Sequence, residues 1–201
     1  MAKSASTALV AVDLHRGHLD PAVATMPVPP QRAAALLECA IPAFKAFRKA
    51  GVPIIHVVTE YRHTREIESN PFWKSRQSPT RGNAMRHNLA GSPGVEIMPG
   101  LFVEGDSVVN GKKRYSAFLH TGLEFLLRSV AARTVLLAGV NTNSCILSTA
   151  FEVVNRDFEL VVLEDCVDSM DGPEAHAMAL QMVRLCLGRV AASGEIVSEL
   201  A

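Results

Sequence analysis

Apolar runs alternate along the chain with segments in which apolar residues recur at helical spacing. The short apolar runs predict strands at Thr7–Val12, Val52–Val58, Ser107–Asn110, Thr134–Ala138, Glu159–Leu163 and Arg189–Ala192. The periodic segments predict helices over about Gln31–Ala50, His120–Arg133, Thr142–Arg156 and Pro173–Leu187. Pro42 lies inside the first helical segment and is expected to kink or split it, because proline lacks the N–H that a helix interior uses.

The predicted strands are apolar throughout rather than alternating, which is typical of strands buried on both faces. We therefore predict an α/β fold of three layers, αβα, around a mostly parallel sheet of roughly six strands. The length favours a single domain over residues 1–201. Residues 60–100 are different, because they are polar, contain four prolines and show no sustained period. A loop of this length in a compact domain is usually functional.

Charge and composition argue against nucleic acid and anionic membranes as partners. Lys plus Arg and Asp plus Glu number 20 each, so the net charge is zero and neither nucleic acid nor an anionic membrane is expected. No apolar stretch approaches the roughly 20 residues that span a bilayer, and no secretory segment is recognised, so a cytoplasmic location is expected. The cysteines lack CxxC or zinc spacing and are expected to be free thiols: they are Cys39, Cys145, Cys166 and Cys186.

Reactive side chains stand where predicted strands end. Asp13 ends the first strand, Lys112 follows the third, and Cys145 follows the fourth at the start of a helix. Because ligands bind beyond the carboxyl ends of parallel strands, a carboxylate, an ammonium and a thiol are expected at one edge of the sheet. Each residue alone has an ordinary structural explanation, as a turn residue, a solvated charge or a small buried hydrophobe. Their convergence favours catalysis by a cysteine nucleophile.

The residue types suit acyl transfer. The helix N-terminus and Lys112 are expected to lower the pKa of the Cys145 thiol and favour the thiolate. Asp13 could accept the thiol proton and return it to a leaving amine. Backbone N–H groups of Asn141 and Cys145 could form an oxyanion hole.

The other cysteines are weaker candidates. Cys39 and Cys186 lie in amphipathic helices and are expected in the core. Cys166 follows the fifth predicted strand, near the active edge. Its acidic neighbours are expected to raise its pKa and make it a poor thiolate; they are Glu164, Asp165 and Asp168.

At these residues the chain resembles the isochorismatase-like cysteine hydrolases, which include nicotinamidases and N-carbamoylsarcosine amidases. ALVAVDLHRGHL resembles the opening strand of that family and places its catalytic Asp on Asp13. KKRYSAFLHTGLEFLL is similar to K-x-x-x-S-A-F-x-x-T-x-L and places the catalytic Lys on Lys112, not Lys113. AGVNTNSCILSTAFEV is similar to G-V-x-T-N-x-C-x-x-x-T-A, which places the nucleophile on Cys145, and LVVLEDCVDS resembles the strand that follows.

The resemblance implies further features. It implies a cis peptide bond between Val140 and Asn141, before the oxyanion-hole residue. It also implies a homodimer or homotetramer. Because true isochorismatases lack the nucleophilic cysteine, Cys145 favours amide or ureido hydrolysis over vinyl-ether cleavage.

The chain departs from the family at two places. The opening motif D-x-Q-x-x-F carries His15 and His18 at the amide and aromatic positions. Metal-binding nicotinamidases carry D-x-H after the second strand. In this chain Tyr61 stands at the carboxylate position of that motif and His63 at the histidine position. A later nicotinamidase histidine matches His87. Two histidines without a carboxylate make a poor zinc site, so neither a metal nor another cofactor is predicted.

The predicted function is cysteine-dependent hydrolysis of a C–N bond in a small amide or N-carbamoyl or ureido compound, through a thioester. Candidate substrate-binding residues could form a cationic, hydrogen-bonding set suited to an acid amide; they are His15, His18, Arg62, His63, Trp73 and Asn143, with Arg81 beside them. Three alternatives remain open: a non-catalytic small-molecule-binding protein, a thiol redox protein pairing Cys145 with Cys166, and a vinyl-ether hydrolase.

Overall fold

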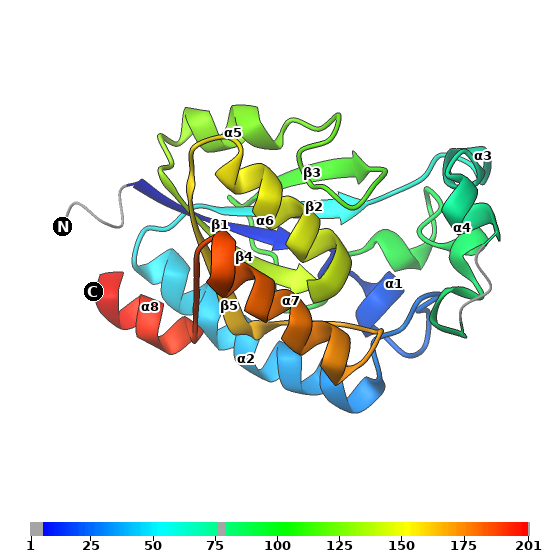
Figure 1. The fold of residues 1–201 in the computed structure, drawn as a ribbon, viewed down its shortest axis with the longest axis horizontal. Helices are drawn as coiled ribbons and strands as arrows, with labels where there is room; N and C mark the ends of the chain where they lie inside the picture. The colour runs from blue at the N-terminus through cyan, green and yellow to red at the C-terminus, as the bar shows by residue number, and fades with distance from the viewer. Residues whose placement is uncertain (1–5, 76–78, 201) are drawn as a thin grey trace.

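The sheet has six strands, and every neighbouring pair is parallel (Figure 1). The computed structural model describes residues 6–75 and 79–200. The strand order is β3-β2-β1-β4-β5-β6. The strands are β1 (Thr7–Val12), β2 (Ile54–Thr59), β3 (Ser107–Lys112), β4 (Thr134–Val140), β5 (Glu159–Asp168) and β6 (Arg189–Ala191). The predicted α/β architecture is confirmed.

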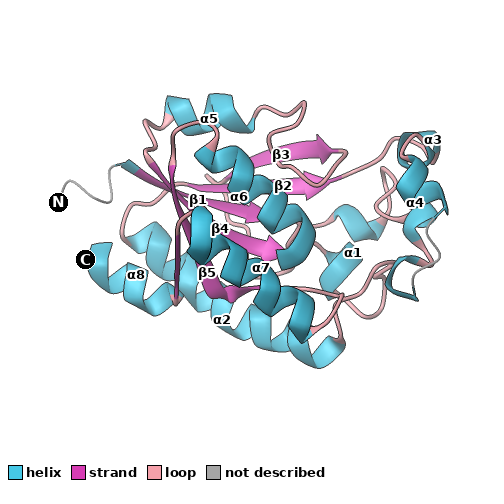
Figure 2. Cartoon of the chain, viewed as in Figure 1, coloured by secondary structure: helices cyan, strands magenta, loops and turns pink. Residues whose placement is uncertain are grey.

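Helices cover both faces of the sheet (Figure 2). The described α-helices are α1 (Arg16–Leu19), α2 (Pro30–Lys49), α3 (Arg65–Glu68), α4 (Pro71–Ser75), α5 (Leu123–Ser129), α6 (Leu147–Val154), α7 (Pro173–Cys186) and α8 (Ser193–Leu200). One apolar cluster joins the sheet to α5, α6 and α7, and a second joins its other face to α2 and α8. No helix within residues 6–75 and 79–200 is long and apolar enough to cross a membrane.

Helix α2 runs unbroken through Pro42, so of the two expected effects, a kink or a split, the split is wrong. Pro42 is exposed, whereas Phe44 and Phe47 are buried on the opposite side of the helix. The carbonyl that proline leaves without a partner therefore meets water, and the packed face stays regular. Burial of that face outweighs the lost hydrogen bond.

Other boundaries differ at the active end of the sheet. Strand β4 continues to Val140 and β5 to Asp168, well past the predicted ends. Residues Thr142–Ile146 form a π-helical turn before α6 begins. Helix α8 was not predicted, and α5 is shorter than the pattern indicated.

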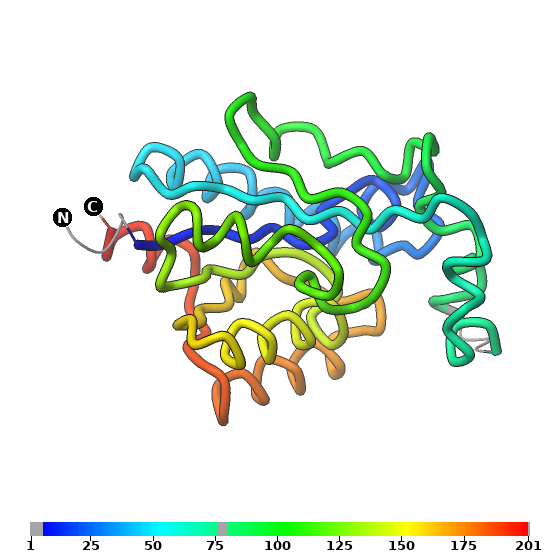
Figure 3. Tube along the Cα trace, turned by 90° about the horizontal axis from the view of Figure 1, so that it is seen from above, coloured from blue at the N-terminus to red at the C-terminus, as the bar shows by residue number. Residues whose placement is uncertain are grey.

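The described part of the polar segment, residues 60–75 and 79–100, lies beyond the carboxyl ends of the strands and holds α3 and α4 (Figure 3). It also forms short 3-10 turns at Pro79–Arg81, Ala84–Arg86 and Pro93–Val95. One isolated bridge, between His15 and Ile97, joins the segment to the turn after β1, and another, between Tyr61 and Leu89, lies within the segment. It is therefore a structured wall at the edge where the sequence predicts chemistry.

Two cysteines do not lie where the pattern placed them. Cys39 and Cys186 are exposed, although both occupy amphipathic helices. Each lies on the solvent side of its helix, because other residues of the helix form the apolar face that packs against the sheet. The described cysteines are all free thiols.

Gly139 permits the close approach of β4 to β1. It pairs with Val12, its φ is +130°, and a Cβ built there would lie 1.9 Å from the Val12 carbonyl oxygen. Gly139→Ala is expected to lower the free energy of unfolding by about 3 kcal/mol, since a backbone oxygen cannot move aside cheaply. That corresponds to a Tm lower by about 6–12 °C in thermal unfolding. Gly194→Ala, where a Cβ meets open space, is the matched control; equal Tm changes in both variants contradict the packing argument.

Candidate active site

Three adjacent strand ends bring polar groups into one buried cluster. Asp13 follows β1, Thr59 ends β2 and Lys112 ends β3. The Lys112 ammonium donates to Asp13 Oδ2 at 2.6 Å and to Thr59 Oγ1 at 2.8 Å. Thr59 in turn donates to Asp13 Oδ1 through its backbone N–H at 2.9 Å and its hydroxyl at 2.8 Å. Both carboxylate oxygens are thus held in place.

Cys145 joins this cluster from β4. Lys112 Nζ lies 3.3 Å from its Sγ, and both side chains are buried. The peptide bond between Val140 and Asn141 is cis. The Asn141 side chain accepts a hydrogen bond from the Met170 backbone N–H at 2.9 Å, which fastens the turn after β4 to the loop after β5. The sequence-predicted groups Asp13, Lys112 and Cys145 therefore share one site.

Asp13 has a left-handed backbone, with φ of +56°. Its backbone N–H donates to the Val57 carbonyl at 2.9 Å, which continues the sheet pairing past the end of β1. Non-glycine residues adopt this conformation rarely, and such strain occurs often at functional sites. The turn allows the carboxylate to reach across β2 toward Lys112.

The charges of the site stabilise one another. Burial acts to raise the pKa of the Asp13 carboxyl, but Lys112 and His15 outweigh it and hold that pKa well below its usual range. Burial acts to lower the pKa of Lys112, and the Asp13 carboxylate outweighs it and raises that pKa. The free site therefore contains an ionised Asp13–Lys112 pair.

The thiol is not activated in the way the sequence indicated. Burial raises the pKa of Cys145 to about 11; Lys112 acts to lower it, while Asp13 adds to the increase. Desolvation therefore exceeds the effect of the ammonium, and the expectation of a lowered pKa is wrong. The resting site holds a neutral thiol beside an ion pair.

A small cavity opens onto the thiol. Its wall is mainly apolar, with polar groups gathered at the strand ends and on two histidines. The lining residues are Asp13, His18, Met26, Thr59, Tyr61, Ile67, Trp73, Arg81, Ala84, His87, Lys112, Arg114, Tyr115, Asn141, Ser144, Cys145 and Met170. Three substrate-binding candidates from the sequence, His18, Trp73 and Arg81, line it.

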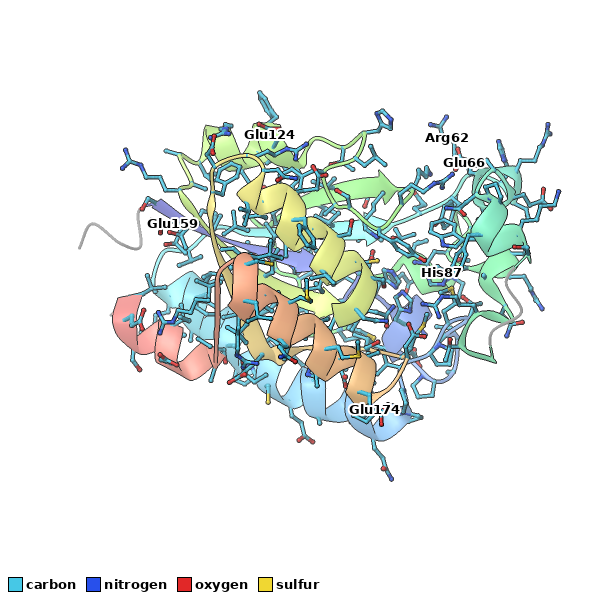
Figure 4. The ribbon with its side chains drawn as sticks, in the orientation of Figure 1. Arg62, Glu66, His87, Glu124, Glu159 and Glu174 are labelled. Carbon is cyan, nitrogen blue, oxygen red and sulfur yellow. The ribbon has the colours of Figure 1, made fainter. Side chains whose placement is uncertain are left out.

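Other candidates lie outside the cavity. Arg62 and His63 are exposed, and Arg62 pairs with Glu66 at the edge of the molecule (Figure 4). His87, by contrast, lies on the side that carries α1 and α4 (Figure 4). The prediction that Arg62 and His63 line the pocket is therefore wrong, because the chain turns outward into α3 directly after Tyr61. His15 is buried next to Asp13, behind the cavity surface.

Asn143 supports the cavity rim rather than its interior. Its side chain donates to Asp171 at 2.9 Å and accepts from the Ser169 hydroxyl at 2.6 Å. Arg81 forms a two-pronged contact with the same Asp171 carboxylate, at 2.6 and 2.7 Å. Arg81 holds the pKa of Asp171 at about 2. The salt bridge ties the 60–100 segment to the loop after β5.

Aromatic residues form the opposite part of the rim. The Trp73 indole donates to the Tyr115 hydroxyl at 2.8 Å, and the Arg114 guanidinium lies 5.0 Å from the Trp73 ring centre. Trp73 is therefore held by a hydrogen bond to Tyr115 and by a cation–π contact with Arg114. Trp73 therefore both packs against the rim and lines the cavity.

Sequence reasoning missed Thr59 and Asn88. Thr59 ends β2 and bridges the acid and the ammonium, so the strand-end argument could have found it. Asn88 donates to the Thr59 carbonyl at 2.8 Å from within the 60–100 segment. No periodic signal marks Asn88, because its position depends on how a non-repetitive loop folds back.

The nicotinamidase D-x-H motif has no metal-ligating counterpart here. Tyr61 is buried and its hydroxyl donates to the Lys113 carbonyl at 3.2 Å, while His63 is exposed. His87 is buried near His18 instead. Burial, with His15 as the next contribution, lowers the pKa of His18 to about 3, and burial with His18 lowers that of His87 well below its usual range. Both rings are uncharged at neutral pH.

The model of the isochorismatase domain family matches residues 7–195. The chain belongs to the isochorismatase family. It is 27% identical over 173 residues to a probable inactive nicotinamidase of Arabidopsis thaliana, across 85% of this chain and 84% of that protein. It is 28% identical over 157 residues to the ureidoacrylate amidohydrolase RutB of Methylobacterium radiotolerans, across 74% of this chain but only 60% of RutB. The resemblance seen in the sequence is confirmed.

Solved structures of the isochorismatase family share the fold. A cysteine hydrolase from Pseudomonas syringae superposes with a TM-score of 0.85 and 22% identity, over 98% of this chain and 93% of that one. N-carbamoylsarcosine amidase from Thermoplasma acidophilum superposes with a TM-score of 0.72 and 25% identity, over 94% and 96% of the two chains. The protein is an isochorismatase-family hydrolase with amidohydrolases among its relatives.

The thiol redox alternative finds little support in this isochorismatase fold. Cys145 belongs to the apolar cluster under α5, α6 and α7, whereas Cys166 belongs to the cluster under α2 and α8. The sheet separates the two thiols. Burial, followed by Asp165, raises the pKa of Cys166, so this cysteine is also a poor attacking thiolate.

Proposed function

We propose that the protein is a cysteine-dependent amidohydrolase that cleaves a C–N bond of a small amide or N-carbamoyl or ureido compound. One observation carries the proposal: the Cys145 thiol and the Asp13 carboxylate share the buried Lys112 ammonium, at 3.3 and 2.6 Å from Nζ. A vinyl-ether cleavage needs no thiol nucleophile. The amidohydrolases among the relatives support the same reaction class.

The first step joins Cys145 Sγ to the substrate carbonyl carbon in a tetrahedral adduct. Asp13 accepts the Sγ proton while the sulfur attacks the substrate carbonyl carbon, and the carbonyl π electrons move onto oxygen. An Asp13 hydrogen bond contributes to the raised thiol pKa, which supports direct proton transfer to this carboxylate. Because the thiol pKa is about 11, ionisation is coupled to attack rather than complete beforehand. Backbone N–H groups of Asn141 and Cys145 stabilise the oxyanion.

The second step releases the amine. As the oxyanion collapses, the C–N bond breaks and Asp13 gives its proton to the departing nitrogen, which leaves as ammonia or an amine. Water then attacks the thioester with Asp13 again as base, which frees the acid and restores the thiol. Lys112 stays protonated throughout and stabilises whichever of its neighbours carries negative charge.

The cavity supports a small substrate. Ile67, Trp73 and Met170 supply an apolar wall, and Arg81 and Arg114 supply positive charge near the rim. The reacting groups have no net charge at rest, since Asp13 and Lys112 form an ion pair and Cys145 is neutral. An uncharged amide or carbamoyl group with an acidic tail fits this distribution.

Ammonia release across a substrate panel tests the proposal. The panel comprises nicotinamide, maleamate, ureido acids, biuret and simple amides. Ammonia is expected from at least one member, and acid quenching during turnover is expected to trap an acyl group on the Cys145 peptide, detected by mass spectrometry. A panel that yields no ammonia from a folded protein whose Cys145 still reacts with iodoacetamide would favour a non-catalytic binding protein.

A further inference from the structure

Three buried histidines form a cluster that the proposed hydrolysis does not use. One ring nitrogen from each of His15, His18 and His87 lies within 4.8 Å of the others. The His15 and His18 rings are stacked with centres 4.9 Å apart, and the His18 and His87 ring centres are 4.6 Å apart. His15 and His18 come from the turn after β1, whereas His87 comes from the 60–100 segment. Folding therefore assembles the cluster from distant parts of the chain.

Hydrogen bonds orient two of these rings toward the cavity. His18 Nδ1 donates to the Met26 carbonyl oxygen at 2.6 Å, so its Nε2 carries the lone pair. His87 Nδ1 is 2.9 Å from the Thr25 hydroxyl, and donation in that direction leaves Nε2 with the lone pair too. No hydrogen bond among the described residues occupies either Nε2. Both rings line the cavity, where a ring nitrogen with a free lone pair can bind a ligand.

The same pattern is characteristic of histidines that bind metal ions. A metal-ligating histidine usually donates its second ring N–H to a backbone carbonyl, hydroxyl or carboxylate, which fixes the tautomer and the ring. His15 lies on the inner side of the cluster, where its Nε2 is 3.5 Å from Asp13 Oδ1 and 2.9 Å from the donor Asn88 Nδ2. His18 and His87 therefore have the supporting hydrogen bond that orients a ligating ring.

We infer that His15, His18 and His87 bind one divalent first-row transition-metal ion, with Zn²⁺ as the representative. Imidazole nitrogens suit zinc, copper, iron or nickel, and three protein ligands leave a fourth position open. His18 and His87 line the cavity, so that position faces the space beside Cys145. A donor atom of a bound small molecule, or water, would occupy it.

The distances require only a modest contraction. Nitrogen ligands around a tetrahedral zinc ion lie about 3.3 Å apart, so the widest separation would shorten by about 1.5 Å. The inferred site differs from the D-x-H arrangement, because it replaces the carboxylate and His63 with two histidines from the turn after β1. It also stands independently of amide hydrolysis, because metal binding can be measured without turnover.

Metal titration of the chelator-treated full-length protein tests the inference. Zn²⁺ is expected to bind with one equivalent per chain by calorimetry and elemental analysis, and to raise the Tm. Co²⁺ is expected to give visible absorption without a thiolate-to-cobalt charge-transfer band, which separates imidazole ligands from cysteine. His18→Phe keeps an aromatic ring but loses the lone pair, and is expected to weaken Zn²⁺ binding by more than about 100-fold.

Two further variants keep the test decisive. His63→Ala is the matched control, since it removes an exposed histidine of the nicotinamidase motif and is expected to leave Zn²⁺ affinity unchanged. Thr25→Val retains all three ligands and removes only the hydrogen bond to His87, with an expected loss of about 10- to 100-fold in affinity. It gives the answer even where His18→Phe fails to fold.

Several results would overturn the inferred metal site. Absence of stoichiometric Zn²⁺ or Co²⁺ binding by the folded wild-type protein overturns the inference. Loss of binding in His63→Ala, or unchanged binding in both His18→Phe and Thr25→Val, places the ion elsewhere and also overturns it. A thiolate charge-transfer band with Co²⁺ has the same consequence.

Discussion

Replacing Cys145 with alanine is expected to lower amide hydrolysis by about 10⁴-fold or more, because the thioester route disappears while the cavity remains. The side chain is buried against the core and small, so alanine removes one sulfur atom with little loss of packing. The measurement is ammonia release with the most active member of the substrate panel. Substrate binding, measured by calorimetry, should persist, since the apolar wall and the Asp13–Lys112 pair are retained.

Cys39→Ala is the matched control, since Cys39 is an exposed thiol on the far side of the sheet. It should retain the wild-type rate. Hydrolysis that survives in Cys145→Ala at the wild-type rate contradicts the thioester mechanism and would point to direct attack by water. A comparable loss in both variants would show that the loss in Cys145→Ala does not arise from removal of the nucleophile.

Asp13→Asn is expected to change two properties of the site in opposite directions. Hydrolysis should fall by about 10³- to 10⁴-fold, because the group that carries the proton from sulfur to the leaving nitrogen is gone. Alkylation of Cys145 by iodoacetamide at pH 8 should instead become faster. Asp13 contributes to the raised thiol pKa of about 11, so removing its charge lowers that pKa and increases the thiolate fraction.

Lys112→Met gives the complementary comparison. The ammonium acts to lower the pKa of Cys145, so its removal should slow alkylation at the same pH. The pH dependence of the alkylation rate measures both pKa changes directly. An Asp13→Asn variant that loses hydrolysis and alkylation together would show that the carboxylate only maintains the shape of the site.

The reactive groups could be predicted because parallel strands end at a common edge. Asp13, Lys112 and Cys145 were found by reading the residues that follow apolar runs, and Thr59 obeys the same rule. This rule needs only strand order along the chain and the direction of the sheet. The family motifs agree with the positions that this rule predicts.

Other features depend on quantities that a local pattern does not contain. The pKa of Cys145 reflects how completely the folded chain excludes water, and this outweighs the nearby positive charge. His87 reaches His18 only through the path of an aperiodic loop. Pro42 was overestimated as a helix breaker because its exposure could not be known in advance.

The reacting groups and part of the cavity wall come from different parts of the chain. Asp13, Thr59 and Lys112 stand at the ends of buried strands, whereas Trp73 and Arg81 belong to the 60–100 segment. Loop sequences drift faster than the packed elements that carry them. Descendants of this chain could therefore acquire new substrates through changes in one surface segment, while inheriting an unaltered nucleophile and proton carrier.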